Sequence, residues 1–184
     1  HLAYTIRQDF SEYTGAHARL TLSGGMAFIP GKYPVYQAAE DAAVALDAAK
    51  HQTGKDAFNF LDHTWGWAQF PAILEQQQRL LRIVGGSNSE GEGLQGPSSL
   101  LQILQRLAGT QTRRFQPDKK RAEWGPWMWQ GAYHLKRMQE RYKNRQPELT
   151  AELESIYNEL EKDNYRSIAQ WGFAARWAQL LIRE

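Results

Sequence analysis

The pattern of the chain changes after Trp67. Before this residue, hydrophobic periodicity alternates between helix and strand, with a helix at about 1–14, a strand at Arg19–Ile29, a helix at about Val35–Lys50 and a short strand in AFNFL. Such alternation predicts helices packed on a sheet. After Trp67 the apolar residues recur only at helical spacing, so this half of the chain is restricted to a helical fold. The predicted fold class is therefore α+β.

A stretch rich in glycine and serine divides the helical half. The segment GGSNSEGEGLQGPSS has the composition of a flexible linker or surface loop. Three parts are predicted: a domain at 1–66, a connecting helix and linker at 67–97, and a helical C-terminal domain at 98–184. Helices are expected at about 68–84, 98–109, 126–145, 148–162 and 164–183.

Composition excludes several classes of protein. The chain of 184 residues has no cysteine, which excludes a disulfide framework and a thiolate zinc site. No apolar run approaches the roughly 20 residues needed to cross a bilayer, and the first residues lack the regions of a signal peptide. We therefore expect a cytoplasmic protein without a membrane partner.

The net charge of +2 conceals a basic segment. From Arg113 to Arg145 there are ten Lys or Arg and three Asp or Glu, a charge of +7, and the remainder has twelve against seventeen, a charge of −5. Segregated basic charge is one indication of a polyanionic or acidic partner.

The pair Gly24-Gly25 lies within a predicted strand. A phosphate-binding loop would place such glycines between a strand and the N-terminus of a helix, but apolar Met26 and Ala27 follow here. Glycine inside a strand more often marks a bulge or the close approach of another backbone or a ligand. The structural interpretation is favoured.

The five histidines do not predict a metal site. His1, His17, His51, His63 and His134 lack the i, i+4 spacing that places two imidazoles on one helical face. The pair Asp62-His63 could form one edge of a metal or acid–base site, but an ordinary surface or helix-entry pair is the favoured interpretation. We predict no metal ligand and no catalytic residue in this chain.

Two lysines flank the loop HQTG that follows the second helix. Lys50 is expected at the C-terminus of that helix, where the macrodipole alone favours a cation. The alternative is that Lys50 or Lys55 reaches a nucleotide phosphate as a point charge.

The basic segment combines cations with tryptophans. Arg137, Arg141 and Arg145 are spaced so that they would share one helical face. Lys119 and Lys120 precede them, and Trp127 and Trp129 lie between. These cations are candidates for contact with RNA or a neighbouring subunit, since aromatic residues beside basic ones can stack on unpaired bases. The alternatives are a solvated charged face, and tryptophans that serve as core or interface anchors.

Residues Arg19–Phe60, RLTLSGGMAFIPGKYPVYQAAEDAAVALDAAKHQTGKDAFNF, resemble the palm of the large subunit of type III CRISPR effector complexes. The motifs that carry the resemblance are LSGGMAFIP, the P-x-K-x-P connection and the alanine-rich helix leading into GKDAFNF. HTWGWAQFPAILEQQQRLLRI and SIAQWGFAARWAQLLIR are similar to later helices of that subunit. A diguanylate cyclase, which shares the palm fold, would usually carry an acid and a tyrosine where Ala43 and Asp47 stand.

The resemblance implies the second half of a ferredoxin-like, nucleotide-cyclase-like palm at 1–66, followed by an all-helical domain. In that family the palm binds ATP and a divalent metal, Mg or Mn, and joins adenylates into cyclic oligoadenylate. The Gly-Gly-Asp-Asp hairpin that holds the metal is absent here and is expected before His1. Lys50, Lys55 and Ser23 are then expected to face the nucleotide, and the chain alone should be inactive.

The resemblance also implies partners. These are guide RNA and target RNA within a multi-subunit ribonucleoprotein, a small helical subunit, and the subunit that caps the 5′ end of the guide. Two alternatives remain open: a degenerate diguanylate cyclase, and a stand-alone scaffold without catalysis. The expected anchors of a scaffold are Trp127, Trp129, Trp171 and Trp177.

Overall fold

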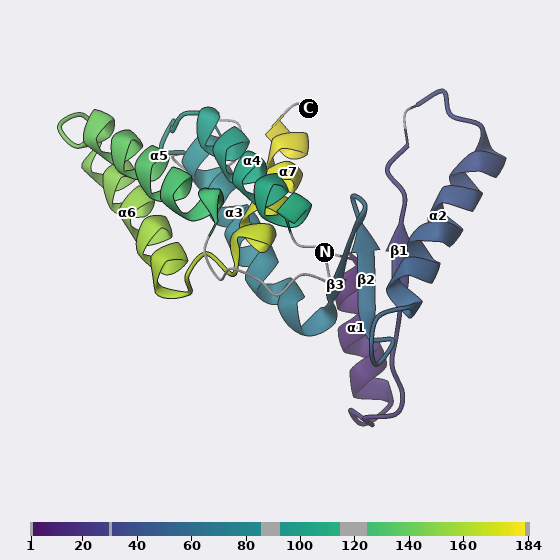
Figure 1. The fold of residues 1–184 in the computed structure, drawn as a ribbon. Helices are drawn as coiled ribbons and strands as arrows, with labels where there is room; N and C mark the ends of the chain where they lie inside the picture. The colour runs from purple at the N-terminus through teal and green to yellow at the C-terminus, as the bar shows by residue number, and fades with distance from the viewer. Residues whose placement is uncertain (1, 30, 86–92, 115–124, 183–184) are drawn as a thin grey trace. The chain divides into compact units, whose positions relative to one another are not determined.

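The computed structural model describes residues 2–29, 31–85, 93–114 and 125–182 (Figure 1). The chain divides into two compact units, a first unit at His1–Ala72 and a second unit at Ile73–Glu184. Each unit has its own arrangement of secondary structure, and we describe them separately.

The first unit combines helices with a small sheet. Its elements are α1 (Leu2–Tyr13), β1 (Gly24–Met26), α2 (Val35–Lys50), β2 (Ala57–Phe60), β3 (His63–Gly66) and the 3-10 turn η1 (Trp67–Gln69). The strand order is β1-β2-β3, with β1 parallel to β2 and β2 antiparallel to β3. The α+β class is therefore confirmed, and α2 has the predicted bounds. A sheet of three strands does not by itself establish the ferredoxin-like topology.

Strand β1 is much shorter than the predicted strand at Arg19–Ile29. It pairs with β2 over three positions, from Gly24 opposite Phe58 to Met26 opposite Phe60. Strand β2 ends at Phe60, so the residues after Met26 have no ladder partner in it. The apolar alternation that predicted a long strand leaves Phe28 exposed instead of buried.

The sequence analysis did not predict β3. It forms a hairpin with β2, in which Phe60 pairs with His63 across a turn made by Leu61 and Asp62. Both turn residues have positive φ, 51° and 63°. A two-residue turn of this kind normally carries Asn-Gly or Asp-Gly, so Leu-Asp gave no recognisable signal.

An aromatic cluster forms the core of the first unit. Phe58 stacks on Trp67 with ring centroids 5.1 Å apart, and Tyr4 of α1 stacks on Phe70 at 5.3 Å. The indole Nε1 of Trp67 donates a hydrogen bond of 2.7 Å to the carbonyl of Leu22, which satisfies its only polar atom. The cluster thus ties α1 and the approach to β1 to the end of the hairpin.

The second unit is helical. Its helices are α3 (Phe70–Val84), which begins in the first unit, α4 (Ser99–Arg114), α5 (Pro126–Tyr142), α6 (Pro147–Lys162) and α7 (Ile168–Ile182). Pro126 and Pro147 occupy first-turn positions, where the missing N–H costs nothing. Helix α7 begins four residues later than predicted, because a turn with Asn164 and Tyr165 at positive φ precedes it. Part of the predicted linker, 86–92, lies outside the described residues.

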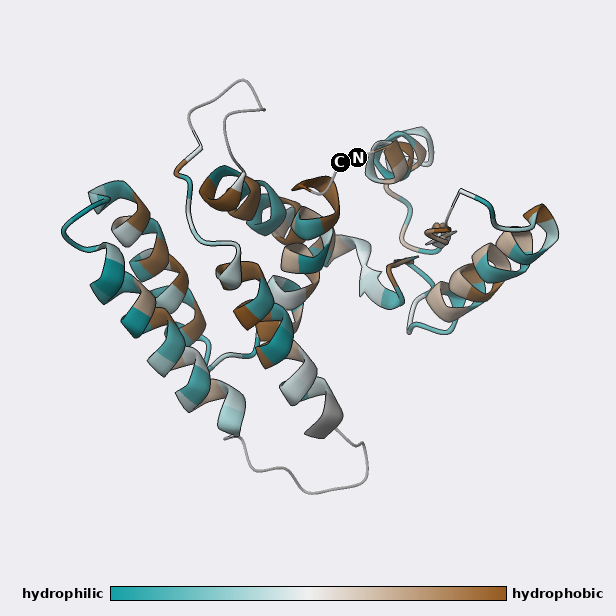
Figure 2. Ribbon diagram, turned by 90° about the horizontal axis from the view of Figure 1, so that it is seen from above, coloured by the Kyte–Doolittle hydropathy of each residue, from teal (hydrophilic) through white to brown (hydrophobic). Residues whose placement is uncertain are grey.

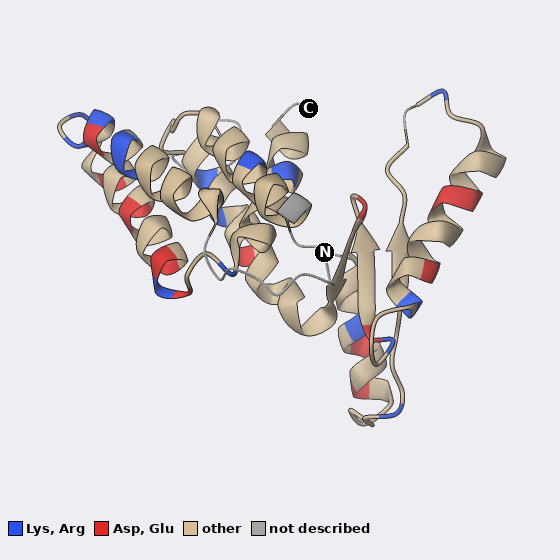
Figure 3. Cartoon of the chain, viewed as in Figure 1, with Lys and Arg blue, Asp and Glu red and all other residues tan. Residues whose placement is uncertain are grey.

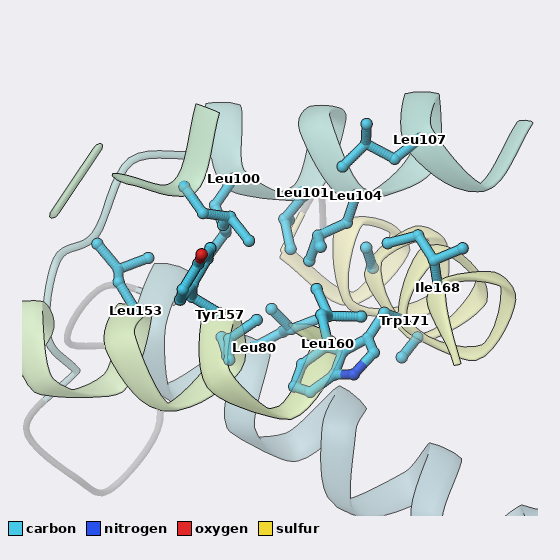
Figure 4. Close-up of a cluster of buried hydrophobic side chains, with 14 of the residues drawn as sticks. Leu80, Leu100, Leu101, Leu104, Leu107, Leu153, Tyr157, Leu160, Ile168 and Trp171 are labelled. Carbon is cyan, nitrogen blue, oxygen red and sulfur yellow. The ribbon is translucent and has the colours of Figure 1, made fainter. Parts of the chain in front are cut away.

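The core of the second unit is built mainly from leucine. Leu104 and Leu107 of α4, Leu153 and Leu160 of α6, and Trp171 of α7 converge in one cluster (Figure 4). Helices α4 and α7 pack along much of their length. Teal and brown residues lie on different sides of the helices in Figure 2, as expected when amphipathic helices bury one face.

An ion-pair network joins α3 to α6 at the surface. Arg79 donates hydrogen bonds of 2.6 Å to both Glu152 and Glu159, and Arg82 donates one of 2.6 Å to Glu152. The guanidinium of Arg79 also lies 5.8 Å from the ring centroid of Trp171. In the part of the chain that the structure describes, no helix is long and apolar enough to span a membrane.

Candidate functional site

The three predicted nucleotide-facing residues gather at one edge of the sheet. Ser23 immediately precedes β1, and Lys55 lies two residues before β2. Helix α2 connects the two parallel strands and packs on both, so its C-terminal residue, Lys50, returns to the edge at which the strands begin (Figure 1). Lys and Arg colouring appears in Figure 3 at the end of α2 and in the loop before β2.

Direct contacts link only part of this set. The hydroxyl of Ser23 donates a hydrogen bond of 2.6 Å to the backbone carbonyl of Lys55. Lys55 has φ of 51° and follows Gly54 at 85°, which turns the chain sharply between α2 and β2. The amino group of Lys50 lies 3.9 Å from the Asp47 carboxylate, and both side chains are more than half exposed. Such a pair is weak, so Lys50 stays available to a phosphate.

The two glycines of β1 permit close packing, Gly25 against the backbone of α2 and Gly24 against the ring of Phe58. A Cβ added at Gly25 would collide with the backbone of α2, lying 2.6 Å from the carbonyl carbon of Ala45. A Cβ at Gly24 would lie 2.8 Å from the ring of Phe58. Glycine thus permits the close approach of another backbone to the strand, as the favoured interpretation predicted.

This edge offers cations but no assembled metal site. Within 2–29, 31–85, 93–114 and 125–182, no three His, Asp or Glu side chains come together in a way that could hold a metal ion. The two lysines at the edge, Lys50 and Lys55, both have exposed side chains. The groups that would ligate a divalent ion are not gathered there.

Sequence reasoning missed the ion pair between Arg7 and Asp56 beside this edge. Arg7 of α1 donates two hydrogen bonds to the carboxylate, of 2.9 and 3.0 Å, and Asp56 also accepts from the backbone N–H of Leu22 at 3.4 Å. The hydrogen bond and charge of Asp56 raise the pKa of Arg7 despite partial burial. Two such distant charges have no sequence signature, because only the fold brings them together.

A second candidate surface lies on α5. Arg137 and Arg141 are exposed on this helix, as predicted. Arg145 is also exposed but does not share their helical face, because α5 ends at Tyr142 and Arg145 lies in the following turn. Lys119 and Lys120 lie outside the described residues.

The cations of this surface have aromatic and imidazole neighbours. Arg137 donates a hydrogen bond of 2.8 Å to the Tyr133 hydroxyl and lies 5.9 Å from the centroid of its ring. Arg106 of α4 lies 3.1 Å from Nε2 of His134. Burial, Arg106 and Arg137 lower the pKa of His134, which favours the neutral imidazole as acceptor. No sequence pattern indicates that Arg106, Tyr133 and His134 belong to this surface, because contacts between α4 and α5 bring Arg106 and His134 together.

The two tryptophans of α5 have different environments. Trp127 is 6% exposed and belongs to the core, whereas Trp129 is 64% exposed. Trp129 is therefore the member of the pair that a partner can reach. Trp171, at 1% exposed, also lies in the core.

Comparison with known proteins connects the first unit to one family. Residues 1–59 match the family model for Cas10/Cmr2, second palm domain. The chain is 29% identical over 106 residues to the CRISPR system single-strand-specific deoxyribonuclease Cas10/Csm1 (subtype III-A) of Mycobacterium tuberculosis (strain ATCC 25618 / H37Rv). The match covers 56% of this chain and 12% of that relative. No solved structure matches the chain significantly.

The matched region includes the edge described above. Residues 1–59 contain Ser23, Lys50 and Lys55, and the longer match to the relative extends beyond that segment. Both comparisons find similarity to Cas10 proteins. They confirm the resemblance predicted from the sequence, that of this chain to the large subunit of type III CRISPR effector complexes.

Proposed function

We propose that this chain forms one wall of an ATP-binding palm and a helical scaffold within the large subunit of a type III CRISPR effector. The match of residues 1–59 to a second palm domain carries the proposal. In the assembled protein the palm makes cyclic oligoadenylate from ATP. The helical second unit packs on small helical subunits near the guide and target RNA, and a further subunit caps the guide.

The positions of the lysines support the nucleotide half of the proposal. Lys50 and Lys55 lie at one edge of the sheet with exposed side chains, and each can neutralise a phosphate as a point charge. A divalent ion bound elsewhere in the palm would activate the attacking hydroxyl. The contribution of this chain is to bind and orient the triphosphate, while Ser23 fixes the loop that presents Lys55.

Removal of Lys50 tests this half in the complete complex. The protein is assembled with guide RNA and its partner subunits, and conversion of ATP is measured after target RNA is added. Lys50→Ala is expected to lower kcat/KM for ATP about tenfold or more, because hydrogen bonds to charged groups contribute about 1.5–3 kcal/mol. Lys32→Ala, in the exposed turn before α2, is the matched control. Equal loss in both variants, or no loss in Lys50→Ala, would contradict the assignment.

Cations of α4 and α5 without an acidic partner support the RNA half of the proposal. In the described part of the second unit, Arg106, Arg137 and Arg141 have no carboxylate within ion-pair distance. Charge reversal at Arg137 and Arg141 is expected to weaken target-RNA binding. The slope of the logarithm of the binding constant against the logarithm of the salt concentration should also become shallower, by about one for each phosphate contact that is lost. Arg19→Glu in the first unit is the control. Unchanged affinity across a salt series would exclude contact with a polyanion.

A further inference from the structure

A cavity opens between the start of α5 and the turn that joins α6 to α7. Its volume is about 440 Å³, within the range of small-ligand pockets. Met128, Trp129 and Ala132 line it from α5, Glu161 lines it from the end of α6, and Asn164 and Tyr165 line it from the turn. All of these residues belong to the second unit. Of them, the sequence pattern marks only Trp129 as a candidate, and it does so as an interface anchor.

Tyr165 is the unusual member of this pocket. Its side chain is 3% exposed, and its hydroxyl has no hydrogen-bond partner among the described residues. Burial raises the pKa of Tyr165 well above its usual value, so the hydroxyl keeps its proton. A buried donor without a hydrogen-bond partner lowers stability, and such a group calls for a ligand or an ordered water.

The backbone holds Tyr165 in this position at a cost. Tyr165 and Asn164 both have positive φ, 59° and 56°. Asparagine tolerates this left-handed region, but it is unfavourable for a bulky residue such as tyrosine. The carbonyl of Tyr165 accepts a hydrogen bond of 3.2 Å from Gln111 of α4. Gly131 leaves room for the ring against α5, since a Cβ there would collide with it. Three elements therefore fix one side chain whose polar atom is unused.

The chemistry of the lining selects a flat, uncharged ligand. Among the described residues, no Lys or Arg lines the pocket, and Glu161 contributes a carboxylate, so a phosphate or carboxylate would be repelled. One oxygen of Glu161 accepts from the Tyr157 hydroxyl at 2.9 Å, which leaves the other to accept from a ligand. The amide of Asn164 and the hydroxyl of Tyr165 can each donate or accept. Trp129 supplies an exposed aromatic surface for stacking.

The surface outside the pocket has the opposite charge. Trp129, Tyr133 and Arg137 follow one another at i, i+4 and i+8 along α5, so they form a continuous stripe. Lys136 lies 5.0 Å from the ring of Tyr157, and Glu140 is the acidic residue on this exposed face. Aromatic rings beside unpaired cations are typical of surfaces that bind single-stranded nucleic acid. A basic peptide would be repelled by the cations that lead to the pocket.

We propose that this pocket takes one unpaired nucleobase of a single-stranded nucleic acid whose phosphates follow the cations of α5. Trp129 stacks on the base, Glu161 accepts from its exocyclic amino group, and Asn164 and Tyr165 bind the rest of its edge. On the Watson–Crick edge, adenine and cytosine present an amino group beside a ring nitrogen that accepts a hydrogen bond, whereas guanine presents its amino group beside a ring N–H that donates one. The inference rests on the proposed function in one respect, because the proposed function places this chain beside RNA.

Fluorescence anisotropy with labelled single strands tests the pocket directly. Oligomers of A, C and U of equal length are titrated with the purified chain, with the corresponding DNA strands and an RNA duplex in parallel. We expect A and C to bind more tightly than U, and single strands more tightly than the duplex. Trp129→Ala should weaken binding about tenfold, and Tyr36→Ala, an exposed aromatic of the first unit, should not. The RNA and DNA arms show which nucleic acid is bound.

Tyr165→Phe separates a binding role from a structural one. The change removes only the unpaired hydroxyl, so the urea midpoint should stay the same or rise, while the preference for A and C over U should fall several-fold. Binding unchanged in both Trp129→Ala and Tyr165→Phe would overturn the proposal, as would equal affinity for duplex and single strand, or no binding at low salt. If the protein assembles with guide RNA but its single-strand binding does not depend on the pocket, the pocket proposal is wrong and the proposed function stands. If the binding depends on the pocket but the protein does not assemble with guide RNA and partner subunits, the proposed function is wrong and the pocket proposal stands.

Discussion

The two units of this chain bury their apolar residues to different extents. The second unit encloses a large core of leucine, isoleucine and tryptophan from five helices. The first unit buries a small aromatic cluster and leaves several large apolar side chains exposed, among them Val35 at 83%, Phe28 and Val44. Exposed apolar patches often mark surfaces that another protein or domain covers. The second unit therefore encloses a core of its own, whereas the first unit leaves apolar side chains such as Val35 exposed to solvent.

The largest effect should come from the core of the second unit. Trp171→Ala is expected to lower the free energy of unfolding by about 3–5 kcal/mol, because it opens a cavity among fully buried side chains. Urea denaturation followed by circular dichroism measures the change. Trp129→Ala is the matched control and should shift stability by less than about 0.5 kcal/mol. Similar losses in both variants would contradict the described burial.

The next effect concerns the helix-on-strand contact of the first unit. Gly25→Ala is expected to destabilise the protein by about 1–3 kcal/mol, since the added Cβ meets the backbone of α2. Gly31→Ala, where the Cβ would meet nothing within 4 Å, serves as the control and should be nearly neutral. If Gly25→Ala also leaves the unfolding midpoint unchanged, α2 does not pack on β1 as described.

A smaller effect is expected from the ion pair beside the candidate edge. The side chains of Arg7 and Asp56 are 20% and 30% exposed, so solvent screens their interaction in part. A double-mutant cycle with Arg7→Ala and Asp56→Ala should give a coupling energy of about 1 kcal/mol. A coupling near zero would mean that α1 is not fixed to the sheet by this pair.

The smallest effect is the pH dependence contributed by His134. Because burial and two arginines lower its pKa in the folded state, the unfolded chain binds the proton more readily. The stability from the neutral imidazole is present above the unfolded pKa and is lost as the pH falls toward the lowered folded pKa. Urea midpoints between about pH 7.5 and 5.5 should therefore fall slightly more for the wild type than for His134→Gln. A steeper fall in the variant would contradict the sign.

Local signals predicted much of the secondary structure. Apolar residues at helical spacing gave α2 with its observed bounds, and two prolines mark first-turn positions of α5 and α6. The hairpin of β2 and β3 escaped prediction because Leu61 and Asp62 adopt positive φ without a glycine. Strand β1 ends at Met26 because its partner β2 ends at the paired residue, Phe60, and the apolar alternation near β1 carries no information about where a partner strand ends.

The sites were harder to predict than the helices. Lys50, Lys55 and Ser23 were selected through a family resemblance, and their gathering at one edge follows from the β-α-β connection. The pairing of Arg7 with Asp56 and the unpaired hydroxyl of Tyr165 depend on contacts between distant segments. A tyrosine in a polar stretch between two helices has no sequence property that distinguishes it from a surface residue.

Native mass spectrometry of the protein purified from its own cells tests the central claim most directly. We predict a ribonucleoprotein in which this polypeptide is bound to a guide RNA and to several copies of a small helical subunit. Denaturing mass spectrometry of the same sample would identify each component. Recovery of the polypeptide alone, without RNA or partner subunits, would contradict the assignment to a type III effector.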